Sequence, residues 1–261
     1  MSTLGGPPAN DPWIQRPQPR PAARLRLLLL PHAGGGASAF RGWAGALPPE
    51  VEVCPVQLPG RENRLGERAF DRLQPLVESL AGALERWRDL PYAVLGHSNG
   101  ALIGFELARH ARRTGAPGPV HLFASGRRAP HLPSRTRDVH QLPQAELVAE
   151  LAELGGMPRE VLEHPELMAL LVPLLRADMA LTETYEHRDE PPLAAPITAL
   201  GGTEDAKVPL SDVEAWGRHT CGGFRLHAFP GDHFYLYSRR EPVIAALLPL
   251  LRPLLSPSEP G

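Results

Sequence analysis

The sequence predicts an α/β protein with a mostly parallel central sheet flanked by helices. Short, continuous apolar runs alternate along the chain with longer segments in which apolar residues recur every three or four positions. Runs that are apolar throughout are typical of strands buried on both faces, as in a parallel sheet covered by helices. The expected strands are Leu25–Leu30, Val51–Val56, Tyr92–Leu95, Val120–Ala124, Ile197–Leu200 and Phe224–Phe229.

Helical patterns follow most of these strands, at Leu73–Trp87, Leu102–Arg113, Val208–Gly217 and Pro242–Leu251. Between about residues 130 and 190 the alternation stops, and only helical patterns occur: Gln144–Leu154, Met157–Glu163 and Pro165–Tyr185, the last containing Pro173. Such an insertion would lie above the carboxyl edge of the sheet, where folds of this type bind ligands. We therefore expect a lid rather than additional packing helices.

One domain is expected over residues 23–255. The segment 1–22, rich in Pro, Gly, Asn and Gln, is expected to be a flexible lead-in, although Trp13 and Ile14 offer apolar side chains that can dock on the domain. Residues 256–261 are expected to form a frayed tail.

The composition is that of an ordinary globular protein, with 43% hydrophobic residues and a formal net charge of −2, so bulk charge does not favour nucleic-acid binding. Cys54 and Cys221 form no CxxC pair and are expected to be reduced thiols. No apolar stretch approaches the roughly 20 residues that a membrane helix needs. We expect a cytoplasmic monomer that contacts no membrane.

The pentapeptide Gly96-His97-Ser98-Asn99-Gly100 follows one predicted strand and precedes a helical pattern. In this position a GxSxG sequence forms a sharp strand-to-helix turn that exposes the serine, with small flanking residues allowing the close approach of strand and helix. The alternative is an ordinary glycine-rich turn. The setting favours an α/β-hydrolase fold with Ser98 as nucleophile.

A serine hydroxyl needs a base to remove its proton, and in this fold the base comes last in the chain. His233 follows the last predicted strand and meets that requirement. Other histidines have structural explanations: His110, His164 and His187 are expected on polar helix faces, and His121 and His227 within strands. No HExxH or Cys/His cluster indicates a metal site.

The acid that orients the base is expected in the loop after the preceding strand, where Glu204 and Asp205 follow Gly201-Gly202-Thr203. Asp205 is preferred because it stands just before the next helical pattern, and Glu204 is the alternative. Asp232 adjoins His233, but neighbouring side chains in a loop rarely face each other.

Two backbone N–H groups are expected to bind the oxyanion, those of Asn99 and Ala33. Ala33 lies in the glycine-rich loop Pro31–Gly36 after the first strand. The spacing Gly34-x-Gly36-x-x-Ala39 also imitates a dinucleotide fingerprint. The next strand ends at Gln57, however, where an acidic ribose partner is expected, so no cofactor is predicted.

With these residues in place, the chain resembles the type II thioesterases that accompany polyketide and nonribosomal peptide synthases. The resemblance spans nearly the whole chain. It rests on the segments Leu30-Pro31-His32-Ala33-Gly34-Gly35, Gln57-Leu58-Pro59-Gly60-Arg61-Glu62-Asn63-Arg64, Gly96-His97-Ser98, Gly231-Asp232-His233-Phe234-Tyr235-Leu236, Leu142-Pro143 with Glu146-Leu147, and Leu175-Arg176-Ala177-Asp178. Asn99 departs from the family, which more often has methionine there.

The resemblance implies hydrolysis of acyl thioesters on the phosphopantetheine arm of acyl or peptidyl carrier proteins, removing stalled or misprimed units, with the catalytic roles falling on Ser98, Asp205 and His233. Carrier proteins of this type are acidic, so arginines near the site are candidate docking residues. These are Arg127, Arg128, Arg135 and Arg137 beside the lid, and Arg61 and Arg64 in another loop. A solvated, arginine-rich surface explains them equally well.

Two other functions remain open. A general carboxylesterase or an acyltransferase would form the same acyl-enzyme, and only the family-like loops argue against it. A hydrolase fold used as a non-catalytic binding module is disfavoured by the serine, acid and histidine in their expected order.

Overall fold

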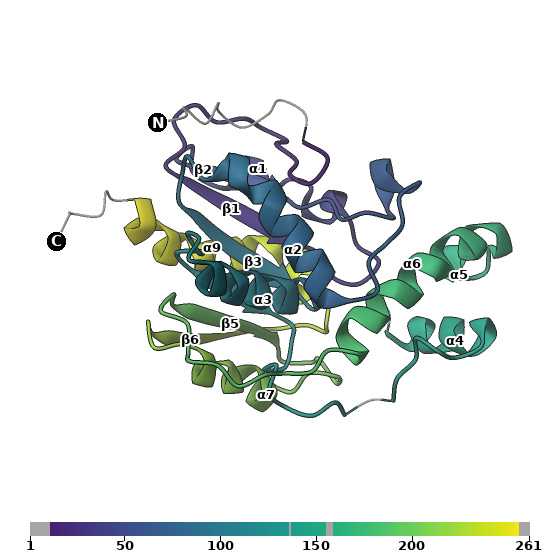
Figure 1. The fold of residues 1–261 in the computed structure, drawn as a ribbon. Coiled ribbons are helices and arrows are strands. Elements are labelled where there is room, and N and C mark those ends of the chain that lie inside the picture. The colour runs from purple at the N-terminus through teal and green to yellow at the C-terminus, as the bar shows by residue number, and fades with distance from the viewer. Residues whose placement is uncertain (1–10, 136, 155–158, 256–261) are drawn as a thin grey trace.

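The computed structural model describes residues 11–135, 137–154 and 159–255, and its centre is a parallel β-sheet (Figure 1). In the described part of the chain six strands lie in the order β2-β1-β3-β4-β5-β6, and every neighbouring pair is parallel. Their bounds are β1 Leu25–Leu30, β2 Val51–Pro55, β3 Tyr92–His97, β4 Leu122–Ser125, β5 Ile197–Gly202 and β6 Phe224–Phe229. The predicted fold class is confirmed.

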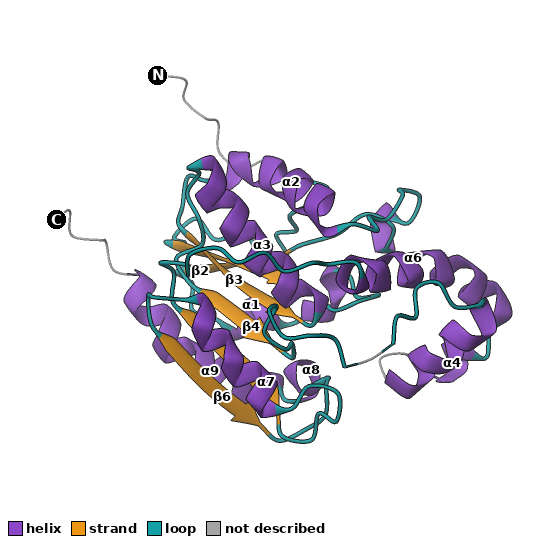
Figure 2. Ribbon diagram, turned by 60° about the horizontal axis from the view of Figure 1, so that its bottom comes forward, coloured by secondary structure: helices purple, strands orange, loops and turns teal. Residues whose placement is uncertain are grey.

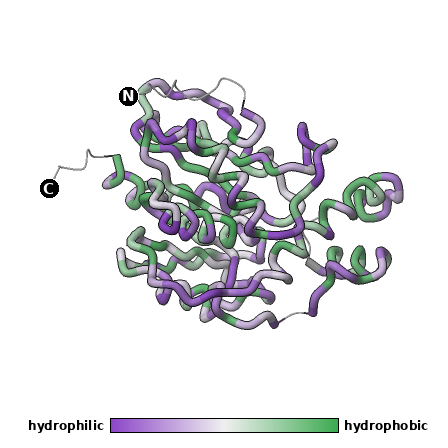
Figure 3. The backbone as a smooth tube through the Cα atoms, in the orientation of Figure 1, coloured by the Kyte–Doolittle hydropathy of each residue, from purple (hydrophilic) through white to green (hydrophobic). Residues whose placement is uncertain are grey.

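Helices cover both faces of the sheet (Figure 2). Alternate residues of β1 point to opposite faces: Leu28 and Leu30 pack with α2 (Leu73–Leu84) and α3 (Asn99–Thr114), whereas Leu25, Leu27 and Leu29 pack with α1 (Trp43–Ala46), α8 (Tyr235–Ser238) and α9 (Arg240–Leu251). Burial of both strand faces explains the continuous apolar runs. Figure 3 shows the hydrophobic residues concentrated along the strands and along much of α6.

Two predicted helices were too long because each ends in a 3-10 turn. α2 passes into a turn at Glu85–Trp87, and α7 (Leu210–Glu214) passes into one at Ala215–His219. In contrast, α3 begins at Asn99, directly after Ser98, rather than at Leu102 as predicted.

The predicted helical insertion lies between β4 and β5 and projects from one end of the sheet (Figure 1). It consists of α4 (Gln144–Leu154), α5 (Arg159–Leu162) and α6 (Pro165–Glu183), and α6 continues through Pro173. Gly155-Gly156, Met157 and Pro158 lie outside the described residues. The helices share a small apolar core of their own, made by Val139, Leu147, Leu151, Met168, Val172 and Leu175. The insertion therefore has a core of its own, while Leu181 near the end of α6 packs with α2 and α3.

The chain before β1 is attached to the domain from Asp11 onward. Ile14 is 2% exposed and forms an antiparallel bridge with Val56, while the Asp11 carboxylate accepts a hydrogen bond from the Trp87 indole at 3.0 Å. Further along, the N–H of Arg20 donates to Glu52 at 3.1 Å. Residues 11–20 are therefore held on the domain, because the Ile14 backbone bridges to the edge of the sheet and its side chain is buried. Residues 1–10 and 256–261 lie outside the described residues.

Within the described ranges, no helix is both long and apolar enough to cross a membrane.

Candidate active site

Ser98 occupies a strained turn between β3 and α3. Its φ of 54° and ψ of −112° are rare for a residue with a side chain, and such strain persists only where the surroundings enforce it. The Ser98 N–H donates to the carbonyl of Ser125 on β4 at 2.8 Å. A Cβ on Gly96 would lie 2.1 Å from the Gly100 carbonyl oxygen, and one on Gly100 would lie 2.1 Å from that of Leu30. Only glycines permit this close crossing of strand and helix.

His233 and Asp205 come together across the ends of β6 and β5. The His233 Nδ1 lies 2.7 Å from the Asp205 Oδ2. Two backbone bonds hold the loops that carry them: Thr203 N–H donates to the Phe229 carbonyl at 2.8 Å, and Glu204 N–H to the Gly231 carbonyl at 2.9 Å. Of the two carboxylates left open by the sequence, Asp205 is buried and bonded to the imidazole, whereas Glu204 is exposed. Asp232 accepts the Phe234 N–H in its own turn.

Asp205 is held as a carboxylate despite its burial. Burial by itself raises the pKa of this carboxyl group, but the hydrogen bond and charge of His233 outweigh that effect. The N–H groups of Lys207 and Val208 also donate to Asp205 Oδ1, at 2.9 and 3.0 Å. The net result is a lowered pKa, so the group is ionised at neutral pH and able to stabilise an imidazolium.

His233 borders the serine turn, because the ring of His97, the residue before Ser98, lies 5.1 Å from the ring of His233. His97 is fully buried at the end of β3, and its Nδ1 lies 2.9 Å from the Ser125 hydroxyl. That hydroxyl is in turn 2.6 Å from the Tyr235 hydroxyl. Burial lowers the pKa of His97 well below its usual value, so this ring is neutral. This buried chain could not be predicted from the sequence, because its members come from three separate elements.

The glycine-rich loop after β1 lies beside the start of α3. Gly34 has a φ of 77°, and the His32 ring is fixed by a 2.7 Å contact with the Tyr237 hydroxyl. Burial, with the nearby charges of His233 and Arg61, lowers the pKa of His32 to about 4. As the first residue of α3, Asn99 has a backbone N–H with no acceptor inside the helix. The contact of Leu30 with Gly100 brings the loop and this helix start together.

Arg61 and Arg64 do not face solvent, which argues against their predicted part in carrier docking. Arg61 is 4% exposed, and its guanidinium forms a two-pronged ion pair with Asp178 of α6, with both N···O distances 2.8 Å. Arg64 is also buried and pairs with Glu67 at 2.5 Å. Both charges are already neutralised within the chain.

The arginines beside the insertion are partly buried or paired with carboxylates of the same chain. Arg127 is half-buried, and burial together with Arg128 lowers its pKa to about 10. Arg128 and Arg135 both pair with Asp212, at 2.8 and 2.7 Å, and Arg137 pairs with Glu150 at 2.5 Å. A docking role for Arg127 and Arg128 stays a prediction.

Asp178 was not singled out as a site residue. It is 1% exposed and accepts the Gly34 N–H at 2.6 Å in addition to the two bonds from Arg61. The side-chain amide of Asn99 donates to the Asp178 backbone carbonyl at 2.8 Å. A signal for Asp178 was present in the sequence, because it is an acidic residue within the apolar stripe of a helical pattern. A carboxylate in such a position needs a buried partner.

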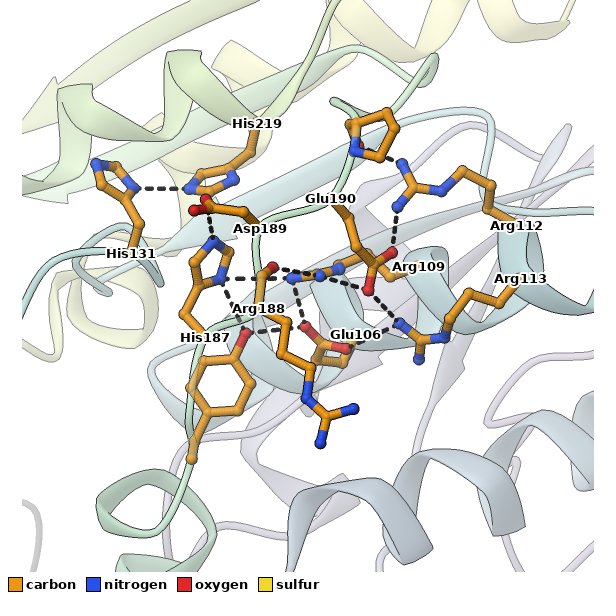
Figure 4. Close-up of polar contacts among 12 residues, drawn as sticks. Glu106, Arg109, Arg112, Arg113, His131, His187, Arg188, Asp189, Glu190 and His219 are labelled. Carbon is orange, nitrogen blue, oxygen red and sulfur yellow. Dashed lines mark hydrogen bonds and ion pairs between the residues drawn. The ribbon is translucent and has the colours of Figure 1, made fainter.

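A second polar cluster lies at the base of the insertion (Figure 4). His131 Nδ1 lies 2.7 Å from His219 Nε2, and the His187 ring is centred 5.2 Å from that of His219. His187 was expected on a helix face but lies in the loop after α6. That loop is held to α3 through Glu190, which pairs with Arg109 at 2.5 Å. Among the described residues, no group of three or more His, Cys, Asp or Glu side chains is arranged to hold a metal ion.

Similarity to known proteins identifies the family of this chain. Residues 25–250 match the family model described as thioesterase domain. The gramicidin S biosynthesis protein GrsT of Aneurinibacillus migulanus is 44% identical over 245 residues, which cover 94% of this chain and 96% of GrsT.

Two solved structures share both the fold and much of the sequence. RedJ, the thioesterase of the prodiginine biosynthetic pathway in Streptomyces coelicolor, is 44% identical with a TM-score of 0.80, covering 87% of this chain and 85% of RedJ. YbtT, the type II thioesterase of the yersiniabactin NRPS/PKS pathway, is 32% identical with a TM-score of 0.84, covering 94% of this chain and 100% of YbtT. On the strength of these matches, the chain belongs to the thioesterase family and is a type II thioesterase of polyketide and nonribosomal peptide biosynthesis.

Proposed function

We propose that this enzyme hydrolyses acyl thioesters held on the phosphopantetheine arm of acyl or peptidyl carrier proteins, and so releases stalled or misprimed units from a synthase. The observation that carries the proposal is the 2.7 Å bond between His233 and Asp205 beside the strained turn at Ser98. The related proteins GrsT, RedJ and YbtT are described as members of biosynthetic pathways of this kind, which supports the choice of substrate.

In the proposed first step, Ser98 is the nucleophile and His233 the base. Because His233 Nδ1 is bonded to Asp205, its Nε2 is the nitrogen left to take the Ser98 proton. The Ser98 oxygen then bonds to the thioester carbonyl carbon, and the carbonyl oxygen becomes an oxyanion. The backbone N–H groups of Ala33 and Asn99 are the proposed donors to it. When the carbon–sulfur bond breaks, His233 returns the proton to the pantetheine sulfur.

The second half repeats this chemistry with water. His233 takes a proton from a water molecule, the hydroxide bonds to the acyl carbon, and the Ser98 oxygen leaves with the proton that His233 returns. The products are a free carboxylic acid and the regenerated serine. The ionised Asp205 stabilises the imidazolium that forms in both halves.

Variants of the two neighbouring carboxylates provide a matched test. Hydrolysis of an acylated carrier protein should disappear in Ser98→Ala and fall by about 10⁴-fold in kcat in Asp205→Asn, because an asparagine leaves the imidazole in the wrong tautomer. Glu204→Gln, one residue away and exposed, should retain activity. Equal losses in Asp205→Asn and Glu204→Gln would contradict the assignment.

Two measurements address the competing functions. A fluorophosphonate should label the wild type at Ser98 and should not label Ser98→Ala, whereas a binding module would not be labelled at all. The ratio of kcat/KM for an acyl group on a carrier protein to that for the same acyl group in a simple oxoester should be far above one. A ratio near or below one would favour a general carboxylesterase.

A further inference from the structure

Asp178 connects helix α6 to the loop proposed to bind the oxyanion. Its carboxylate accepts the Gly34 N–H at 2.6 Å through Oδ2, the oxygen that also accepts Arg61 Nη1 at 2.8 Å. The second oxygen accepts Arg61 Nη2 at 2.8 Å. Among the described residues, the bonds of this buried carboxylate therefore go to groups in the two loops below α6. A charged pair of this kind is stable in a protein interior only while both partners remain in place.

Arg61 fixes the same loop from a second direction. Its Nη1 donates to the Gly35 carbonyl at 3.1 Å, while its own backbone carbonyl accepts the Gln57 side-chain amide at 2.9 Å. The Gln57 oxygen accepts the Ala37 N–H at 2.8 Å. The peptide groups immediately after Ala33 are therefore held by Asp178 and Arg61. The His32 carbonyl, in the same peptide group as the Ala33 N–H, accepts the Gly35 N–H at 3.0 Å, so the direction of the Ala33 N–H depends on the same loop.

Asn99 connects α6 to the other proposed oxyanion donor. Its side chain is 6% exposed, and its amide donates to the Asp178 carbonyl at 2.8 Å. Its backbone N–H is the second proposed donor. A methionine at this position has no hydrogen to donate, so the unusual asparagine supplies a bond that the common residue cannot make.

From these contacts we propose that Asp178 and the Asn99 side chain are positioning residues that couple α6 to the oxyanion hole. Asp178 holds the loop after Ala33 through its side chain, and it holds the start of α3 through its backbone carbonyl. The hole is complete only while α6 is seated, and lifting α6 breaks the buried ion pair and displaces both donors together. This inference rests on the proposed function, because it assumes that Ala33 and Asn99 bind the oxyanion.

The variants Asn99→Met and Asp178→Asn test the coupling. Asn99→Met keeps the side-chain size and loses one hydrogen bond, so kcat should fall by about five- to tenfold with little change in KM. Asp178→Asn keeps an acceptor for Gly34 but breaks the ion pair, and the displaced donors should lower kcat by about 10²-fold. Glu183→Gln is the control, because Glu183 of the same helix pairs with His140 at 2.5 Å, away from the loop. It should leave kcat unchanged.

A tetrahedral inhibitor separates positioning from general stability. A trifluoromethyl ketone that matches the acyl group places an oxyanion in the hole when it bonds to Ser98, so its inhibition constant should rise by the same factor as kcat falls. Amide hydrogen exchange over residues 31–37 should also become faster in both variants. This second readout needs no catalysis, so it stays informative even if Ser98→Ala shows that the proposed function is wrong.

The proposal is overturned if Asn99→Met leaves kcat, the inhibition constant and exchange over 31–37 unchanged while Asp178→Asn lowers only the melting temperature. It is also overturned if Glu183→Gln reproduces the losses, because a general loosening of α6 would then explain them. Parallel losses in kcat and inhibitor affinity, with KM and the control unchanged, support it.

Discussion

Replacing His219 with glutamine should make the stability of this enzyme less sensitive to acid. His219 is 7% exposed at the end of the 3-10 turn after α7, and its ring packs edge-on against Phe105 with centroids 5.1 Å apart. Burial, together with the nearby charges of His131, His187, Arg109 and Arg218, lowers its pKa to about 3. The folded protein therefore keeps this ring neutral long after an exposed histidine is protonated.

The size of the effect follows from linkage. The pKa of His219 is lower in the folded state than the value of about 6.5 expected in the unfolded chain, so acid favours the unfolded chain from about pH 6.5 down to about pH 3. Each pH unit in this window costs about 1.4 kcal/mol. At pH 5, which is about 1.5 units into the window, His219 alone lowers the free energy of unfolding by about 2 kcal/mol. For a domain of this size that corresponds to about 4–8 °C in Tm.

Urea unfolding of wild type and His219→Gln at about pH 8 and about pH 5 measures this contribution. Both proteins lose stability, because burial also lowers the pKa of His32 and His121 to about 4. The wild type should lose about 2 kcal/mol more than the variant between the two pH values. Phe105→Leu is the control: it removes a ring packed on His219 but no titrating group, so it should lower stability equally at both. An identical pH-dependent loss in wild type and His219→Gln would refute the reasoning.

Two further predictions concern packing. Gly100→Ala should destabilise the protein by about 3 kcal/mol or more, because its Cβ would lie 2.1 Å from the Leu30 carbonyl oxygen. Gly45→Ala is the control and should leave Tm nearly unchanged, because the new methyl group would lie in open space. Equal Tm values for both variants would show that the crossing of strand and helix is not tight. A thiol reagent should modify Cys221 rapidly and Cys54 only after unfolding, since Cys54 is fully buried and burial raises its pKa. Mass spectrometry of the native protein would contradict this if it found Cys54 modified first.

The sequence by itself determined the strands of the sheet and the positions along the chain of the candidate catalytic residues. Strands such as β1 could be recognised because burial on both faces leaves a continuous apolar run, which is a local property of the chain. The turn at Ser98 and the loop of His233 could be located because each directly follows such a strand. Parallel strands end at one edge of the sheet, so residues after them meet there whatever the details of packing.

Only the tertiary structure decided which charges pair. Glu204 and Asp205 are neighbours in the sequence, yet one is exposed and the other is bonded to His233, because the path of this loop turns only Asp205 toward the imidazole. Arg61 was expected at the surface, but its partner Asp178 lies 117 residues further along the chain. Local periodicity shows which face of a helix is apolar and cannot show which loop that helix will cover. The hydrogen bond from the Asn99 side chain to Asp178 could therefore not be predicted from the sequence.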